Sequence, residues 1–129
     1  MAIAPNDLTP EMLMFLGERH LGFLITQRAD GSPHAVPVGF AFDADRSIVR
    51  IISADNSQKV RNAERGGRAV VSQVDGGRWL SLEGSPTVKR DEVSVAAAER
   101  AYAERYQEPR PRNDRVAIEI SVDRVLGRA

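Results

Sequence analysis

The sequence predicts a mainly β fold, a six-stranded antiparallel β-barrel with helices packed on its outside. Two observations predict it. Segments of strand-forming residues follow one another through short connections typical of hairpins. In a parallel sheet, crossover helices would alternate regularly with the strands. The segments with helical spacing in this sequence do not alternate with the strand segments in that way. The chain has 129 residues, which suits one modest core, and we expect residues 1–129 to form a single domain.

The first element is a helix, expected over residues 10–19. Thr9 is a favourable N-cap, Pro10 suits the first helical position, and Glu11 favours the positive end of the helix. These signals together predict where the helix begins.

A hairpin follows the helix. Residues 21–28 are apolar and rich in strand formers, and residues 33–42 form the answering strand beyond the turn Asp30-Gly31. Pro37 lies inside the second strand and cannot donate to a ladder. It therefore marks an edge, a bulge or a position where a ligand replaces the partner strand.

The middle of the chain predicts a strand, a short helix and two further strands. Residues 48–53 are a near-continuous apolar run that favours a strand. Residues 57–64 indicate a helix that ends before Gly66-Gly67. Residues 68–74 and 78–86 are the next two strands, joined by a glycine-rich turn.

The last third predicts the longest helix and a final strand. Asp91 caps a helix that runs to about residue 107, followed by a short extended linker at 109–111. Residues 115–122 alternate between apolar and polar, as a strand with one buried face does. The apolar positions of the helix are Val95, Ala98, Tyr102 and Tyr106.

The composition excludes several classes of protein. Eighteen basic residues balance eighteen acidic ones, so bulk charge does not favour nucleic acid. The absence of cysteine excludes disulfides, thiolate catalysis and cysteine-ligated metals, and two histidines are too few for a metal cage without many carboxylates. No apolar run approaches the length that spans a bilayer. We expect a soluble cytoplasmic domain that binds neither nucleic acid nor membrane and holds no metal.

No motif for autonomous catalysis is present. The sequence contains neither G-x-S-x-G nor a Gly-rich nucleotide fingerprint. A small protein without an acid–base set often takes its chemistry from a cofactor. The strongest candidate site is Ser57-Gln58-Lys59, where polar side chains, helix N-terminal amides and an ammonium group meet, as a phosphate requires. A solvated N-cap beside a surface lysine would have the same pattern.

Two further segments are candidates for binding a flat ligand. Arg78 and Trp79 follow a glycine pair, and the tryptophan could stack on a planar ring or belong to the core. Residues 34–39 combine Pro37 with Gly39, which leaves backbone groups free for a ligand or marks an edge strand.

Taken together, these segments resemble the flavin and deazaflavin split β-barrel family, whose founding member is pyridoxamine-phosphate oxidase. The resemblance covers about residues 13–126. It rests on R-x-D-G-x-P-H at 28–34, S-Q-K at 57–59 and S-Q-V-D-G-G-R-W-L-S-L-E-G at 72–84. The short chain and the last two motifs are most similar to the actinobacterial branch that uses coenzyme F420, and within it to the F420-dependent biliverdin reductases.

The resemblance implies a homodimer with two cofactor sites at its interface. It implies that Ser57, Gln58 and Lys59 hold the cofactor phosphate. The backbone of one strand would line the ring system of the cofactor. This strand contains His34, Ala35, Val36, Pro37 and Val38. It also implies that Arg50, Ser53 and Asn62 lie near the cofactor tail or phosphate. Arg78 and Trp79 would reach the cofactor across the dimer, and Gln73 is a further cofactor-binding residue that the resemblance implies.

The resemblance also implies an activity, the transfer of a hydride from reduced F420 to a planar conjugated substrate such as biliverdin, giving bilirubin. No side chain is assigned as proton donor, and solvent or an arginine-held water would fill that role. His34 replaces an arginine of the pyridoxamine-phosphate oxidases, and their C-terminal Trp and Arg are missing, so pyridoxal chemistry is not expected. Two alternatives stay open: an FMN-binding oxidoreductase of this fold, and a cofactor or tetrapyrrole carrier without turnover.

Overall fold

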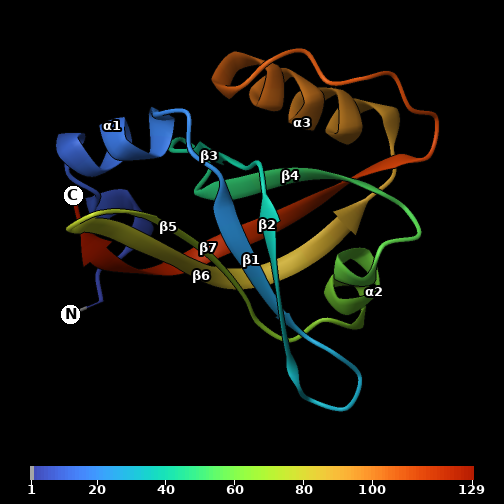
Figure 1. Cartoon of the computed structure of the whole chain (residues 1–129), viewed down its shortest axis with the longest axis horizontal. Coiled ribbons are helices and arrows are strands. Elements are labelled where there is room, and N and C mark those ends of the chain that lie inside the picture. Colours follow the sequence, from blue (N-terminus) through green and yellow to red (C-terminus); the bar gives the residue numbers. More distant parts are fainter. Residues whose placement is uncertain (1) are drawn as a thin grey trace.

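The computed structural model describes residues 2–129, which form one twisted sheet and its flanking helices (Figure 1). The helices are the 3-10 turn η1 (Pro5–Asp7), α1 (Pro10–Gly17), α2 (Gln58–Arg65) and α3 (Glu92–Arg105). The strands are β1 (Gly22–Gln27), β2 (Pro33–Val38), β3 (Ala41–Asp43), β4 (Ile48–Ala54), β5 (Ala69–Asp75), β6 (Arg78–Lys89) and β7 (Arg115–Arg128).

All strand pairs are antiparallel, in the order β2-β1-β5-β6-β7-β4-β3. The two edge strands, β2 and β3, are neighbours in the sequence, separated only by Gly39 and Phe40. Because two residues cannot span the width of a flat sheet of seven strands, the sheet has to roll up until its edges approach. The predicted mainly β antiparallel fold with outer helices is thereby confirmed.

The predicted count of six strands is wrong, because residues 33–42 form two strands and the sheet is not closed into a full barrel. β2 pairs with β1 and β3 pairs with β4. Between them the backbone of Phe40 bonds to side chains at the C-terminal end of α3 rather than to a strand. Its N–H donates to the hydroxyl of Tyr106, the C-cap residue, and its carbonyl accepts from Arg105. Apolar content alone did not reveal this change of partner.

The core fills the inside of the rolled sheet, and the helices occupy different places around it. Fully buried strand residues alternate with outer ones, as at Val49 and Ile51 of β4. α1 covers one end of the barrel with Phe15, and α2 covers the opposite end with Val60 (Figure 1). α3 packs on the outer surface of β3, β4 and β7.

The predicted elements are present with shifted ends. Thr9 and Asp91 cap α1 and α3 as expected, accepting from the N–H groups of Met12 and Ser94 at 3.1 and 3.0 Å. β7 runs beyond the predicted end at residue 122, because a bulge at Asp123 absorbs the break in its alternating pattern.

The outer surface of β1, β5 and β6 carries apolar side chains that no helix of the described chain covers. Phe23, Val74 and Trp79 are 50%, 60% and 38% exposed. The β5–β6 register places Val74 opposite Trp79. We call Phe23, Val74 and Trp79 the apolar face. No helix within residues 2–129 is both long and apolar enough to cross a membrane.

Candidate cofactor and substrate site

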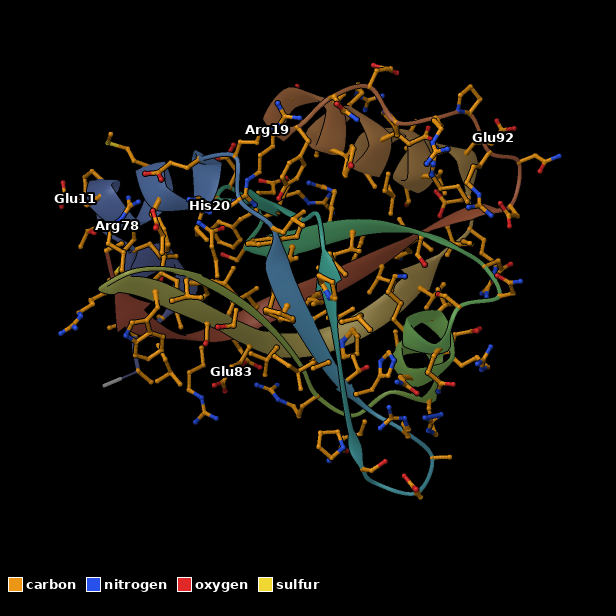
Figure 2. The ribbon with its side chains drawn as sticks, in the orientation of Figure 1. Glu11, Arg19, His20, Arg78, Glu83 and Glu92 are labelled. Atoms are coloured by element: carbon orange, nitrogen blue, oxygen red, sulfur yellow. The ribbon has the colours of Figure 1, made fainter. Side chains whose placement is uncertain are left out.

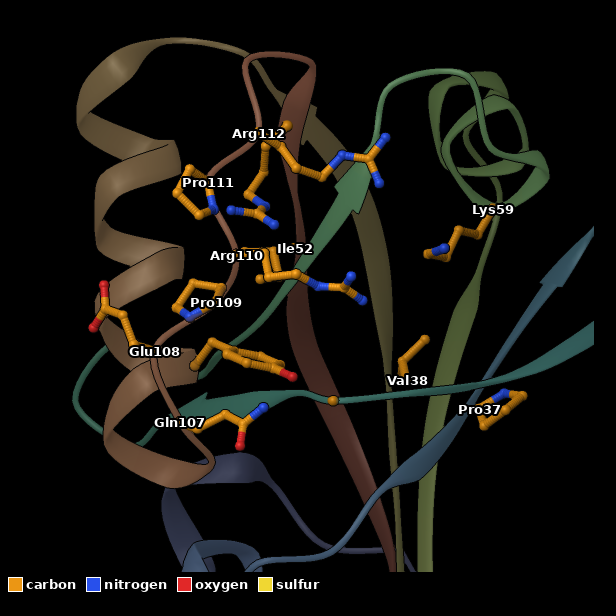
Figure 3. A pocket seen from close by; sticks show the side chains of 13 residues that line it. Pro37, Val38, Ile52, Lys59, Gln107, Glu108, Pro109, Arg110, Pro111 and Arg112 are labelled. Carbon is orange, nitrogen blue, oxygen red and sulfur yellow. The ribbon is translucent and has the colours of Figure 1, made fainter.

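A cavity of about 610 Å³ opens between the end of β2, α2, α3 and the loop that leads to β7 (Figure 3). Pro37, Val38 and Gly39 form one wall, and Ile52 of β4 forms the floor. The residues from Gln107 to Arg112 line the opposite side. The sequence predicted the first wall and the position of Lys59, and it treated the opposite side as a linker.

The turn before α2 directs Lys59 into this cavity. β4 ends at Ala54, and the hydroxyls of Ser53 and Ser57 lie 2.9 Å apart. Ser57 is the N-cap residue, yet its side chain makes no bond to an amide of the first turn. The first amides of α2 are therefore left to an external acceptor, which is the arrangement that binds phosphate groups.

Lys59 is half-buried and forms no ion pair or hydrogen bond with another residue in the described 2–129 range. Burial lowers the pKa of its ammonium group. Figure 3 shows the side chain extending from α2 toward the loop across the cavity. An unpaired cation beside free helix amides provides the donors that a phosphate monoester or diester needs.

His34 of β2 carries a neutral imidazole near this cation. Burial lowers the pKa of His34, and the positive charges of Arg28 and Lys59 lower it further. Its Nδ1 is buried and has no hydrogen-bond partner within residues 2–129. Along the same strand, Ala35 and Pro37 are exposed, Val36 is half-buried and Val38 is buried. The strand thus presents backbone and small side chains to the outside, which suits the approach of a flat ring.

Three arginines follow α3, and they differ in their partners. Arg112 pairs with Asp114 at 2.8 Å, and Arg115 pairs with Glu99 at 2.9 Å. Arg110 has no acidic partner in the part of the chain that is described. In Figure 3 the guanidinium groups of Arg110 and Arg112 point across the cavity toward the side of Lys59. The cavity therefore has cationic groups on two sides.

Asn62 and Gln73, which the sequence predicted near the cofactor, are both buried and bonded inside the protein. Asn62 donates to the Thr26 hydroxyl at 3.0 Å and accepts from Gln58 at 2.7 Å, which fastens α2 to β1. Gln73 donates to the Phe15 carbonyl at 2.8 Å and accepts from Arg105. Their polar groups hold the surrounding elements in place.

Arg50, Arg78 and Trp79 lie outside this cavity within the single chain. Arg50 pairs with Asp43 at 2.9 Å and borders a separate hollow of about 370 Å³ beside α1 and α3. Arg78 binds both Glu18 and Asp75 at 2.6 Å next to His20, at the α1 end of the barrel (Figure 2). Trp79 belongs to the apolar face.

The cluster around Arg78 also contains three groups that could ligate a metal, Glu18, His20 and Asp75. The guanidinium of Arg78 already binds both carboxylates, and it holds the pKa of Glu18 below its usual range. A metal ion would have to displace this arginine. The arrangement therefore acts as an ion-pair network that ties α1 to the β5–β6 turn.

Sequence reasoning missed two parts of the cavity, Tyr102 and Arg110. Tyr102 was assigned to the apolar side of its helix, and it lines the cavity instead. Arg110 lies between two prolines in a segment without regular structure. The signal that could have found them is the conjunction of Pro109 and Pro111, which stiffens a loop that carries arginines.

The family model described as pyridoxamine 5'-phosphate oxidase matches residues 8–129. The chain belongs to this family. A Mycobacterium tuberculosis protein named F420H(2)-dependent biliverdin reductase is 55% identical over 129 residues, which is all of this chain and 94% of that protein.

Solved structures of this oxidase-family fold agree with the architecture. A conserved hypothetical protein from Mycobacterium tuberculosis superposes with a TM-score of 0.79 at 23% identity, over 93% of this chain and 84% of its own. A protein described as an F420 reductase superposes with a TM-score of 0.76 at 23% identity, over 92% and 98%. At these identities the likeness establishes the shared fold.

Proposed function

We propose that this protein is an F420-dependent reductase that transfers a hydride from the reduced deazaflavin to a planar conjugated acceptor, with biliverdin, reduced to bilirubin, as the best candidate. The observation that carries the proposal is Lys59, an unpaired cation at the start of α2 that opens on a cavity of about 610 Å³. The full-length relative at 55% identity, named for this activity, supports the choice of cofactor and substrate.

The donor set of the cavity fits the cofactor. Lys59 and the free first-turn amides of α2 would hold the phosphate, with Ser57 and the backbone of Gln58 beside them. The exposed strand of Ala35 and Pro37 would lie along the ring system. Val38 would contact the cofactor from the cavity wall, and His34, Val36 and Ser53 would support these contacts from behind.

The loop arginines favour F420 over FMN. FMN ends at its phosphate, whereas F420 continues into a lactyl-oligoglutamate tail with several carboxylates. Arg110 and Arg112 lie across the cavity from Lys59, where they provide cationic groups beyond a single phosphate site (Figure 3).

The reaction depends on orientation. Reduced F420 supplies a hydride from C5 of its deazaflavin ring when it is bound. The protein holds the phosphate at Lys59, keeps the ring against β2 and leaves the opposite face open to the acceptor. Fixing two planar molecules face to face supplies a large share of the rate enhancement in such a transfer.

We propose that the active form is a homodimer joined through the apolar face. Phe23, Val74 and Trp79 form an exposed apolar surface on a protein otherwise rich in charge, as interfaces do. A partner on this face would bring Arg78 and Trp79 of one subunit toward the β2 strand of the other. Val74→Glu should give a monomer by light scattering and lose F420 binding, whereas Val93→Glu, at an apolar residue exposed on α3, should do neither.

We also propose that the reaction takes place in the cytoplasm, where a diffusible reduced cofactor can be regenerated by other oxidoreductases. Cell fractionation with an antibody tests this placement.

The test of the proposed function combines binding with turnover. The purified protein is titrated with F420 and with FMN, and is then assayed with reduced F420 against biliverdin, quinones and nitro compounds. We expect tighter binding of F420 and the fastest oxidation of the reduced cofactor with biliverdin. Binding without turnover would make the protein a carrier, and preference for FMN would overturn the choice of cofactor.

A further inference from the structure

Among residues 2–129, Tyr102 of α3 is the only aromatic residue that lines the cavity. Its hydroxyl makes no hydrogen bond to any residue in the 2–129 range. Tyr106, one turn later on the same helix, behaves differently, because its hydroxyl donates to the His20 carbonyl and accepts from the Phe40 N–H at 3.2 Å. The helix therefore carries one phenol that is built into the structure and one that is free for a ligand.

The ring of Tyr102 is held in a fixed place. A Cβ on Gly39 would lie only 2.7 Å from Tyr102 Cε2 and 3.2 Å from Tyr106 Cε2, so the glycine leaves room for both rings against the β2–β3 connection. The two tyrosine rings lie 5.0 Å apart at an angle of 40°. The ring of Tyr106 packs against that of Tyr102 and limits its movement, and a phenylalanine at position 106 would keep this ring contact.

The other polar side chains of the cavity are poorly suited to give up a proton. Arg110, Arg112 and Arg115 are guanidinium groups, which do not deprotonate in proteins. Lys59 is needed as a cation for the phosphate. Gln107 carries no acidic proton, and Glu108 is an exposed carboxylate. Tyr102 alone offers a neutral O–H group to the cavity.

We propose that Tyr102 is the proton donor of the reductase, an inference that rests on the function proposed above. When the hydride arrives, a C–H bond forms at the electrophilic carbon of the acceptor. The displaced π-electron pair moves through the conjugated system to a nitrogen or oxygen. That atom takes the proton of Tyr102 Oη, and the phenolate regains a proton from water. The acceptor thus gains two electrons, one hydride hydrogen and one proton.

The test compares Tyr102→Phe with Tyr106→Phe, the same chemical change one helical turn away. General acids contribute about 10²–10⁴-fold to rate, so we expect Tyr102→Phe to lower the single-turnover rate by about 10²-fold or more. F420 affinity, measured by titration, should stay within about twofold, because the proposed phosphate contacts come from Lys59 and the α2 amides and not from this hydroxyl. Added imidazolium buffer should restore part of the rate of Tyr102→Phe and leave the other two proteins unchanged.

A measurement without reduced cofactor adds a second readout. Biliverdin is titrated into the cofactor-free proteins and followed by its absorption band. Loss of one neutral hydrogen bond, worth about 0.5–1.5 kcal/mol, predicts a Kd raised by about 2- to 12-fold in Tyr102→Phe. Tyr106→Phe should bind like the wild type.

The possible outcomes separate the inference from the function beneath it. Turnover of Tyr102→Phe within twofold of wild type would overturn the proton-donor role, as would a slow variant that no buffer acid rescues. A wild-type protein that neither binds F420 nor turns over would overturn the proposed function itself, and the inference with it.

Discussion

Replacing Lys59 is the sharpest test of where the cofactor phosphate lies. The perturbation is Lys59→Met, which keeps the length and apolar stem of the side chain and removes its charge. Two unit charges about 4 Å apart attract by about 4 kcal/mol at an effective dielectric of about 20, before desolvation is counted. The net value of a charge-assisted hydrogen bond is about 1.5–3 kcal/mol, so we expect Kd for F420 to rise by about 10- to 150-fold.

The surroundings of Lys59 support this expected rise in Kd of about 10- to 150-fold. No carboxylate in the described chain pairs with the ammonium group, and the Lys59 side chain is half-buried. Because burial lowers its pKa, the charged form costs folding free energy in the empty protein. Removing the charge should therefore leave the melting temperature unchanged or raise it. A melting temperature that does not fall would show that weaker F420 binding by the variant is not caused by loss of folding.

The pH dependence gives an independent check. The site needs the charged form, and Lys59 loses its proton as pH rises through its lowered pKa. Affinity for F420 should therefore decline at a lower pH than that at which an exposed lysine titrates. Lys59→Arg should bind F420 with little decline over the same range, because guanidinium stays protonated.

The assay is a titration of F420 followed by its fluorescence, at several pH values and salt concentrations. Lys89→Met is the matched control, because Lys89 is the only other lysine and lies at the end of β6 outside the cavity. An unchanged Kd in Lys59→Met, with the pH profile of the wild type, would refute the assignment of the phosphate site.

Three further substitutions test other parts of the structure. Gly39→Ala would push the Tyr102 ring aside, and overpacking of this kind costs about 1–3 kcal/mol. The value of kcat/KM for biliverdin should therefore fall about tenfold or more. Unchanged kinetics would contradict the position described for the Tyr102 ring. Gln73→Leu removes the buried hydrogen bonds that Gln73 makes to the Phe15 carbonyl and to one guanidinium nitrogen of Arg105. Urea unfolding should report a loss of about 2–4 kcal/mol with unchanged F420 affinity, and weaker binding would instead make Gln73 a cofactor contact. Arg68→Ala removes an exposed pair with Asp123, and its urea midpoint should match that of wild type, since exposed pairs add little stability.

Patterns local in sequence predicted most of the fold. Thr9 and Asp91 cap their helices, and Asp30-Gly31 turns its hairpin, because each of these preferences acts over a few residues. The split of residues 33–42 into β2 and β3 could not be predicted in this way. It depends on Arg105 and Tyr106, about 65 residues further along the chain, which take up the backbone groups of Phe40.

The candidate site also has parts that could be predicted from the sequence and parts that could not. The S-Q-K motif predicted a cation at a helix start, and the structure places Lys59 there. The arginines that follow α3 could not be assigned from the sequence, because the residues that line a cavity from two sides meet only after folding. Asn62 and Gln73 illustrate the opposite case, where a polar residue near a motif is bonded within the protein.

The gap between β2 and β3 has a consequence for how the protein can change. In residues 2–129 no ladder hydrogen bonds join these edges, and the wall of the cavity ends at that gap. Exposed residues of β2 at the cavity wall, such as Pro37, can change in size while the strand ladders and the core stay intact, so substrate range can change with little loss of stability. The hydrogen bonds that Arg105 and Tyr106 make with the backbone of Phe40 limit how far the two edges can separate. Hydrogen exchange at the amides of β2 and β3 should be fastest in the sheet and should slow when a ligand bridges the gap.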